Sequence, residues 1–364
     1  MNVPKLRFKE FNDEYVKLKY KDVLKIKSGK DQKQVENKNG KYPILGTGGQ
    51  IGKTNSFLYD KPSVLIGRKG TINKPQYMKS PFWTVDTLFY SHIYEPNIPK
   101  YLFYSFQNVN WKKYDESTGV PSLSSSTIEN VECNIPSPNE QIKVANFLSL
   151  LDKKIELQTK KIEDLKLFKK GFIEFEFSNS NYNEINLKEI LKERKTYSEK
   201  GLEFPHVTLS KDGIYDKTDR YNRDFLVKSD DKKYKITYLN DLCYNPANLK
   251  FGVICLNEYG SAIFSPIYVT FVIKNIANPK YIKYYVTRNN FINAIRKYEQ
   301  GTVYERMAVA PEDFLKFSIK LPNIEIQNKF VVKLSKLDQK IELENLKLSR
   351  YIKLKKGLMQ NMFV

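Results

Sequence analysis

Three short segments carry residue types that could serve catalysis, and each lacks part of what its chemistry needs. The glycine-rich run Gly46–Thr54 suggests a phosphate-binding loop, but Thr47 stands where that pattern requires its first glycine, and Pro62 stops the segment that should form the following helix. Asn245–Asn248 begins like the Asn-Pro loop with which adenine methyltransferases hold a flipped base, yet it has no aromatic residue to stack on that base. Glu193–Lys195 matches half of a metal-dependent nuclease signature without the preceding Pro-Asp. Nucleotide hydrolysis, methyl transfer and DNA cleavage by this chain are therefore disfavoured.

The recognition of DNA bases fits a set of basic and amide side chains better. In Gly67–Lys74, Arg68 can make a bidentate contact to guanine, lysines can contact phosphate, and glycines let the backbone approach a duplex closely. A solvated hairpin tip is the alternative interpretation of this loop. The comparable segments of the second half are Arg220–Arg223, Asn245–Lys250 and Gln300–Arg306. The candidate DNA-binding residues are Gln50, Arg68, Lys69, Thr71, Lys74, Arg220, Arg223, Asn245, Asn248, Lys250, Gln300, Tyr304 and Arg306.

The composition indicates a globular protein with a polyanionic partner. Sixty-one Lys and Arg residues against 41 Asp and Glu residues leave a net charge of +20. Genomic base composition is the alternative explanation for the abundance of lysine. With 364 residues, 41% of them hydrophobic, the chain can form two or three packed domains. No apolar run reaches the roughly 18 residues of a membrane span, and the charged start is no signal peptide. We therefore expect a cytoplasmic protein without membrane association.

The cysteine and histidine content argues against metal chemistry. Three widely spaced cysteines, Cys133, Cys243 and Cys255, provide neither a disulfide framework nor a four-cysteine zinc site. His92 and His206 are the two histidines of the chain, and their apolar and aromatic neighbours favour a structural role for both. We expect no metal site.

An internal repeat organises the chain. A shift of 186 positions aligns residues 135–178 with 321–364 without a gap and gives 16 identities in 44 positions. A shift of 180 pairs Pro99–Tyr101 with Pro279–Tyr281, and a shift of 167 pairs Asp22–Leu24 with Glu189–Leu191. Because the offset grows from 167 to 186, the second copy has about nineteen extra residues in its globular part.

The two matched tails should be helices that pair with each other. An apolar stripe with a 3.5-residue period runs through four heptads of each tail, which is typical of a coiled-coil seam. Polar interruptions recur at Gln158 and Glu344, and at Lys169 and Lys355. The alternative is a helix packed on its own domain. The predicted seam residues are Leu148, Leu151, Ile155, Ile162, Leu165, Leu334, Leu337, Ile341, Leu348 and Tyr351.

Connectivity then predicts the architecture. Each globular part precedes its tail, so paired tails should run antiparallel, with pseudo-two-fold symmetry and a rod of roughly 50 Å. Short strand-like runs broken by Gly, Pro, Asn and Asp indicate small α+β domains. We expect globular domains at residues 1–136 and 179–322, separated by two long antiparallel coiled-coil helices at 137–178 and 323–364.

With these features in hand, the sequence resembles the specificity subunit of type I restriction-modification systems. The resemblance spans the whole chain, but Tyr244–Pro246 replaces the Gly-Arg-Lys loop in the second domain. It rests on Val3–Phe11, Tyr42–Gly46 with Gly52, Leu65–Gly70, Trp83–Thr87, Gln141 with Leu151, Asp152 and Ile155, Gln327 with Leu337, Asp338 and Ile341, and Lys355–Phe363.

The resemblance implies a DNA-recognition subunit with no catalysis of its own. Each globular domain would be a target-recognition domain for one half of a bipartite, asymmetric site in double-stranded DNA. The helices would set the spacer and dock two methyltransferase subunits. Two motor-endonuclease subunits would join the complex. No cofactor would bind this chain, while S-adenosylmethionine, ATP and Mg²⁺ would be used by the partner subunits.

Two other classes of protein remain as alternatives. A stand-alone coiled-coil DNA-binding protein would bind without methylation partners and with little sequence preference. A P-loop or methyltransferase enzyme would turn over ATP or S-adenosylmethionine as a purified chain. The spacer hypothesis also predicts that one heptad inserted after Gln158 lengthens the spacer while both half-sites stay the same.

Overall fold

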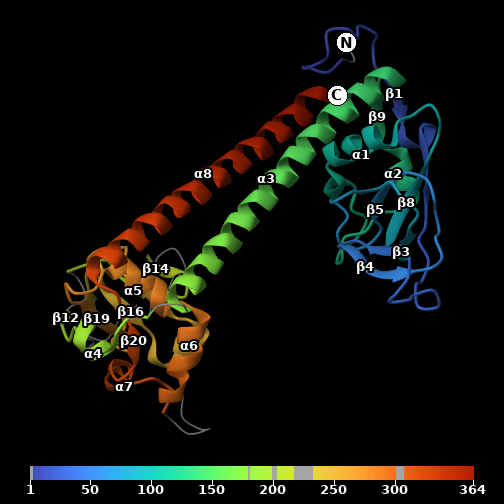
Figure 1. The fold of residues 1–364 in the computed structure, drawn as a ribbon. Coiled ribbons are helices and arrows are strands. Elements are labelled where there is room, and N and C mark those ends of the chain that lie inside the picture. Colours follow the sequence, from blue (N-terminus) through green and yellow to red (C-terminus); the bar gives the residue numbers. More distant parts are fainter. Residues whose placement is uncertain (1–2, 179–180, 199–202, 217–232, 301–306) are drawn as a thin grey trace. The chain divides into compact units, whose positions relative to one another are not determined.

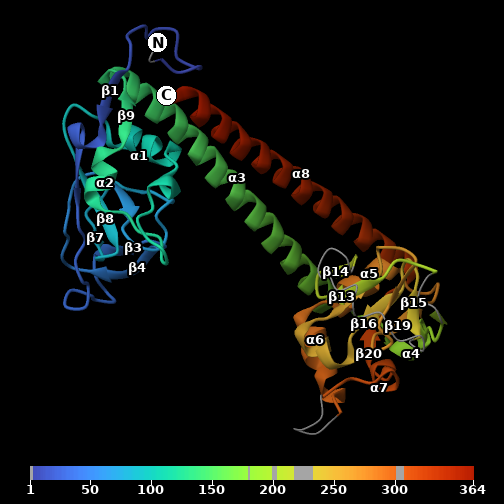
Figure 2. The same ribbon diagram turned by 180° about the vertical axis from the view of Figure 1, so that it is seen from behind.

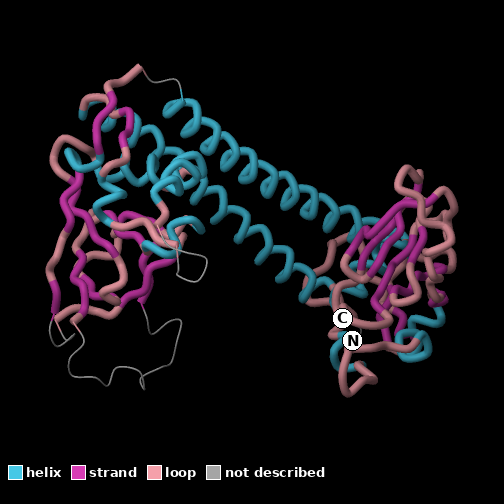
Figure 3. The backbone as a smooth tube through the Cα atoms, turned by 90° about the horizontal axis from the view of Figure 1, so that it is seen from below, coloured by secondary structure: helices cyan, strands magenta, loops and turns pink. Residues whose placement is uncertain are grey.

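The computed structural model describes residues 3–178, 181–198, 203–216, 233–300 and 307–364. The chain divides into two compact units, and each unit takes one globular domain together with part of both long helices. The first unit is residues 1–161 with 344–364, and the second is residues 162–343. Strands and helices are mixed within each domain, so the predicted α+β class is confirmed (Figure 3).

The first domain is built on a four-stranded antiparallel sheet in the order β2-β8-β5-β6. A three-stranded sheet in the order β4-β3-β7 and a β1-β9 pair complete its strands. The strands are β1 (Val16–Lys19), β2 (Leu24–Lys27), β3 (Tyr42–Gly46), β4 (Gly49–Thr54), β5 (Ser63–Gly67), β6 (Gln76–Met78), β7 (Trp83–Thr84), β8 (Leu88–Ile93) and β9 (Glu132–Ile135). The helices are η1 (Tyr20–Asp22), α1 (Pro99–Asn108), η2 (Trp111–Tyr114) and α2 (Ser125–Asn130).

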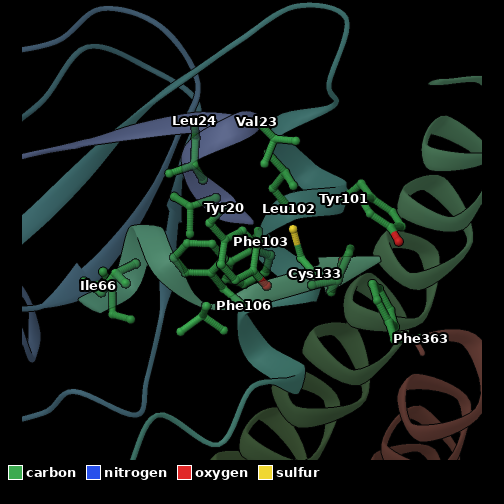
Figure 4. Close-up of a cluster of buried hydrophobic side chains, with 14 of the residues drawn as sticks. Tyr20, Val23, Leu24, Ile66, Tyr101, Leu102, Phe103, Phe106, Cys133 and Phe363 are labelled. Atoms are coloured by element: carbon green, nitrogen blue, oxygen red, sulfur yellow. The ribbon is translucent and has the colours of Figure 1, made fainter. Parts of the chain in front are cut away.

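Aromatic side chains fill the core of the first unit. Every residue of β5 is buried, as expected for the central strand of a covered sheet. Tyr20 packs against Phe106 of α1 with ring centroids 4.5 Å apart, and Figure 4 shows them within the same cluster. Phe363, from the end of the chain, stacks on Tyr101 at 5.3 Å (Figure 4). The last turn of the C-terminal helix therefore belongs to the core of the first domain.

The second domain repeats this plan. Its four-stranded antiparallel sheet has the order β11-β19-β16-β17, and β10 pairs with β20 as β1 pairs with β9. The added strands include the β13-β14 hairpin. The strands are β10 (Glu184–Asn186), β11 (Leu191–Glu193), β12 (Tyr197–Ser198), β13 (Val207–Ser210), β14 (Gly213–Asp216), β15 (Tyr234–Thr237), β16 (Leu242–Tyr244), β17 (Ile254–Leu256), β18 (Ala262–Phe264), β19 (Val269–Ile273) and β20 (Ser318–Lys320). The helices are α4 (Leu187–Ile190), η4 (Pro246–Phe251), α5 (Pro279–Val286), α6 (Asn289–Ile295), η5 (Arg296–Tyr298) and α7 (Pro311–Leu315).

The two long helices are α3 (Pro138–Ser178, 41 residues) and α8 (Ile324–Met362, 39 residues). They run side by side and antiparallel within each unit (Figures 1 and 2). In the first unit Gln158 donates to Glu344 at 2.7 Å and Lys355 pairs with Asp152 at 2.6 Å. In the second unit Phe172 stacks on Phe330 at 5.6 Å. The predicted antiparallel pairing is therefore present in both units.

The predicted seam residues are all buried or partly buried. Leu148 and Leu334, at the start of each helix, pack into the cores of the first and second domain respectively. The first turns of each helix thus serve to attach the helix to its own domain, which was the alternative that the sequence left open.

Several ambiguous sequence features have structural roles. Gly46–Thr54 forms the β3-β4 hairpin instead of a phosphate-binding loop. Trp83 lies in the core, where its indole N–H donates to the Lys30 carbonyl at 2.9 Å. Glu193 and Arg194 are held in ion pairs with Lys235 and Asp241. Within the described part of the chain, none of the helices combines the length and apolar character that a membrane crossing requires.

Candidate nucleic-acid interface

The loop after β5 presents the two basic side chains that the sequence singled out. The Arg68 N–H donates to Thr87 at 2.8 Å, and the Arg68 carbonyl accepts from Leu123 at 2.9 Å. The Gly70 N–H donates to Pro121 at 2.8 Å. Because these bonds use only backbone groups, the Arg68 and Lys69 side chains remain exposed. The loop is therefore fixed in the backbone while its side chains are available to a ligand.

Glycine is required on both sides of this pair. A Cβ at Gly67 would lie 2.5 Å from the Thr71 carbonyl oxygen, so any larger residue would push the loop open. Gly70 has a φ of +84°, a conformation that residues with a side chain rarely adopt. The two glycines are thus the local requirement for this turn.

Arg68 lines a cavity of about 320 Å³ together with Phe89 and Glu116. Its guanidinium carbon lies 6.0 Å from the centre of the Phe89 ring. Hydroxyl groups of Thr127 and Ser124 donate to Glu116, and these bonds lower the pKa of its carboxyl. Among the described residues, no carboxylate forms an ion pair with Arg68 or Lys69. The two cations are therefore free to meet an external anion.

The other candidates of the first domain, Gln50, Thr71 and Lys74, lie in three places. Gln50 is exposed on β4, and its side-chain amide donates to the Gly52 carbonyl at 3.2 Å. Thr71 is partly buried within the loop. Lys74 lines a groove of about 530 Å³ with Gln107 and Lys356, and no carboxylate residue is among those that line it. This groove is a second cationic surface of the first unit.

The second domain carries the equivalent loop with a different sequence. The Pro246 carbonyl accepts from Val309 at 3.2 Å, just as the Arg68 carbonyl accepts from Leu123. Pro246 therefore occupies the position of Arg68, and the loop continues as η4 instead of a Gly-Arg-Lys turn. The departure noted in the sequence thus changes both the backbone and the charge at this place.

Asn245 takes a structural role in this loop. It is only 7% exposed, and its side-chain oxygen accepts from the N–H groups of Ala247 and Asn248, which caps η4. Asn248 is exposed and Lys250 is partly exposed, so both stay candidates for a ligand contact. Phe251, which the sequence analysis overlooked, is 67% exposed beside Lys250.

The remaining candidates of the second domain are only partly described. Gln300 is exposed at the start of its segment, and its amide donates to Asp313 at 2.6 Å. Arg220, Arg223, Tyr304 and Arg306 lie outside the described residues. The predictions for these four side chains stay predictions.

Two buried glutamines, Gln141 and Gln327, attach the domains to the long helices, and the sequence pointed to them through the repeat and the family resemblance. The Gln141 side-chain oxygen accepts the Ile98 N–H at the start of α1 at 2.9 Å, and its amide donates to Pro136 at 3.0 Å. Gln327 makes the same two bonds, to Asn278 at 2.7 Å and to Pro322 at 2.8 Å. Each glutamine therefore joins the first turns of a long helix to the start of one helix of its domain, α1 for Gln141 and α5 for Gln327.

The metal-ligating and thiol side chains of the described residues do not form a site for metal or thiol chemistry. No group of three or more His, Cys, Asp or Glu residues among them could hold a metal ion. Burial raises the pKa of the Cys133 and Cys255 thiols to about 12, and it raises that of Cys243 further. These thiols are poor nucleophiles at neutral pH. The exposed cations of the loop after β5, Arg68 and Lys69, suit the recognition of an anionic ligand.

Comparisons with known proteins agree with this arrangement. The sequence model of the type I restriction modification DNA specificity domain matches residues 12–167. The type I restriction enzyme MjaIX specificity subunit of Methanocaldococcus jannaschii is 35% identical over 148 residues, which cover 37% of this chain and 34% of that protein. The EcoDI specificity subunit of Escherichia coli is 23% identical over 155 residues, which cover 42% of this chain and 34% of that protein. This chain thus spans about a third of the length of both relatives in these matches.

Solved structures share the fold over the full chain. The S subunit of a type I restriction-modification system from M. genitalium has a TM-score of 0.61 at 16% identity, with 100% of this chain and 99% of that chain covered. A chain from a structural study of complex assembly in the type I restriction-modification system has a TM-score of 0.59 at 11% identity, with 95% and 96% covered. At these identities the likeness concerns the fold. Residues 12–167 are thus similar in sequence to the type I restriction modification DNA specificity domain, and the whole chain shares the fold of a solved S subunit of a type I restriction-modification system.

Proposed function

We propose that this chain selects the DNA target of a type I restriction-modification complex without catalysing a reaction itself. Each globular domain reads one half of a bipartite, asymmetric site in double-stranded DNA. Two methyltransferase subunits, using S-adenosylmethionine, and two motor-endonuclease subunits, using ATP and Mg²⁺, act on the selected DNA. The observation that carries the proposal is the exposed Arg68-Lys69 pair on a loop held by backbone bonds.

The charges of the first unit suit two kinds of DNA contact. Arg68, which has no ion pair among the described residues, can read a guanine edge. Lys74 and Lys356 line the carboxylate-free groove and can neutralise phosphates, which adds affinity but no sequence information. A +20 chain supplies this second kind of contact in excess.

Exposed apolar residues on the long helices support docking of the methyltransferase subunits. In the first unit Leu150 and Leu157, seven residues apart on α3, are 68% and 58% exposed. In the second unit Phe168 and Phe175, also seven apart, are exposed on the same helix. Large side chains that recur on one helix face in water mark a surface that a partner covers.

The internal repeat fits two copies of one partner. Leu157 and Leu343 are equivalent under the 186-residue shift, and each is 58% exposed. Phe168 and Leu354 are a second equivalent pair, and both are exposed. A single type of docking surface on the methyltransferase can therefore bind once to each unit.

Co-expression with the methyltransferase subunit, followed by mapping of the modified adenines, tests the proposal. We expect methylation at one bipartite motif with a constant spacer, and none when this chain is omitted. Methylation that does not depend on this chain, or a motif without two parts, would contradict it. Tight binding of the purified chain to any DNA sequence, with no effect on methylation, would favour a stand-alone DNA-binding protein.

A further inference from the structure

A cluster of three side chains joins three elements of the first unit. Tyr104 of α1 donates its hydroxyl to Asp152 of α3 at 2.6 Å. Lys355 of α8 lies 2.6 Å from the other oxygen of Asp152, and its amine is 5.3 Å from the centre of the Tyr104 ring. The recognition domain, the helix that follows it and the helix of the other repeat thus meet at one carboxylate.

The second unit contains the same cluster. Tyr284 of α5 donates its hydroxyl to Asp338 of α8 at 2.9 Å. Lys169 of α3 forms an ion pair with the other oxygen of Asp338 and lies 5.3 Å from the centre of the Tyr284 ring. The aspartates and the lysines are equivalent under the 186-residue shift, and the tyrosines under the 180-residue shift.

The lysine gives each cluster a function that the buried glutamines cannot have. Gln141 and Gln327 connect a domain only to the helix that directly follows it in the chain. Lys355 and Lys169 come from the opposite helix, so the cluster fixes the domain helix against the helix pair. Two bonds to one carboxylate and the lysine over the tyrosine ring restrict rotation of the domain about the first attachment.

The tyrosine hydroxyls remain donors under all ordinary conditions. Burial and the bond to the aspartate raise the pKa of Tyr104 and of Tyr284 well above the usual value. The lysines are only partly exposed, at 18% for Lys355 and 24% for Lys169. Solvent therefore weakens these interactions without removing them.

We propose that the two Tyr-Asp-Lys clusters, Tyr104-Asp152-Lys355 and Tyr284-Asp338-Lys169, are positioning sites that fix the angle of each recognition domain on the helix pair and thereby hold the DNA spacer to one length. The inference rests on the proposed function. The clusters touch no DNA base in this scheme, so they act on the distance between the half-sites and not on their sequences.

The test is a double variant, Lys169→Met with Lys355→Met, in the full chain co-expressed with the methyltransferase. We expect the same two half-site sequences, with an increase of about fivefold or more in methylated sites whose spacer differs by one base pair. Lys169→Arg with Lys355→Arg should restore the single spacer, because a guanidinium can also pair with the carboxylate. The matched control is Lys160→Met with Lys353→Met, which changes two exposed lysines of α3 and α8 that form no ion pair among the described residues.

The outcomes separate the inference from the proposed function. A single unchanged spacer in the double variant, with normal methylation, overturns the inference and leaves the proposed function standing. Altered half-site bases overturn it as well. Absence of a bipartite motif with the unmodified chain contradicts the proposed function instead. If the lysine variant does not fold, Tyr104→Phe with Tyr284→Phe removes only the two hydroxyls, and an unchanged spacer there also overturns the inference.

Discussion

At the scale of single residues, local backbone geometry decides which side chains can serve recognition. The side chains of Arg68 and Lys69 are exposed, while the peptide groups of this pair bond only to the backbone of Thr87 and Leu123. Asn245 looked similar in the sequence, but its oxygen caps η4 and its side chain is buried. A polar residue next to a turn is therefore a good candidate only when the turn does not use its side chain.

Replacement of Arg68 by alanine should change which bases the first half-site tolerates. A bidentate arginine-guanine contact contributes about 1–3 kcal/mol of discrimination, and its loss removes the preference at one position. The methylated sites of the Arg68→Ala variant should therefore show one relaxed position and an unchanged second half-site. A motif identical to that of the unmodified protein would show that Arg68 reads no base.

Replacement of a groove lysine serves as the comparison. Lys74→Ala should weaken binding to all sequences alike and reduce the slope of log affinity against log salt by about 1. Titrations of specific and unrelated duplexes at several salt concentrations measure this slope. If this variant lost affinity for the specific duplex alone, Lys74 would contact a base and not a phosphate.

At the scale of elements, one polar contact between α3 and α8 joins two residues that occupy the same position in the two copies of the repeat. Gln158 and Glu344 are equivalent under the 186-residue shift, and they bond to each other at 2.7 Å. Lys161 and Lys347 also pair with Glu344. A shift of the pairing by one heptad would set Glu344 against an apolar seam residue, so this contact specifies the register.

Stability of the helix pair should depend on the charge of Glu344. Bonds from Gln158, Lys161 and Lys347 lower the pKa of this carboxyl to about 2. Because the pKa is lowered in the folded state, the carboxylate stabilises the fold at pH values above the ordinary pKa of a carboxyl group. This stabilisation is lost as the pH falls towards 2. The difference in Tm between the unmodified protein and Glu344→Gln should therefore shrink between pH 5 and 2. Thermal unfolding monitored by circular dichroism measures this difference in Tm. A difference in Tm that stays the same from pH 5 to pH 2 would contradict the assignment. The control is Glu342→Gln, at an exposed position.

The contacts between the antiparallel helices refine the heptad experiment that the sequence suggested. Register contacts lie on both sides of Gln158, at Asp152–Lys355 in the first unit and at Lys169–Asp338 in the second. An insertion after Gln158 alone leaves one heptad of α3 without a partner, so the single insertion stays a prediction and a paired insertion is the sharper test. Insertions after both Gln158 and Glu344 keep each seam paired.

The paired insertion should lengthen the spacer. One heptad adds about 10 Å of helix, which corresponds to about three base pairs. Mapping of methylated adenines should show unchanged half-sites with a spacer that is longer by this amount. If the variant with both insertions folds and its spacer is unchanged, the helices do not set the spacer length.

At the scale of the whole molecule, the end of the chain completes its first domain. Met359, Met362 and Phe363 of the last turn are buried in the core formed by residues near the start of the chain. The Leu6 N–H donates to Asn361 at 2.8 Å, and Arg7 pairs with Glu140 at 2.8 Å. The core of the first domain therefore includes a segment more than two hundred residues away in sequence.

Phe363→Ala should destabilise the first domain. Loss of a buried phenylalanine from a packed core costs about 3 kcal/mol. Chemical unfolding of the full chain should show a lower midpoint for the variant, while Leu167→Ala, which removes a side chain that is 69% exposed, should change little. Equal midpoints for Phe363→Ala and the unmodified chain would show that the last turn is not part of the core in solution.

The sequence by itself determined the repeat, the two helices, their antiparallel pairing and the first basic loop. These features follow from patterns along the chain, namely an apolar stripe with a 3.5-residue period, positions repeated in both halves and an arginine between two glycines. Such patterns can be recognised without knowing which distant residues are in contact. Only the tertiary structure decided that Pro246 occupies the place of Arg68, that Asn245 is a cap and that Phe363 fills the first core. It also brought Tyr104, Asp152 and Lys355 to one point. These relations join residues far apart in the chain, and a side chain acquires such partners only when the elements that carry them pack together.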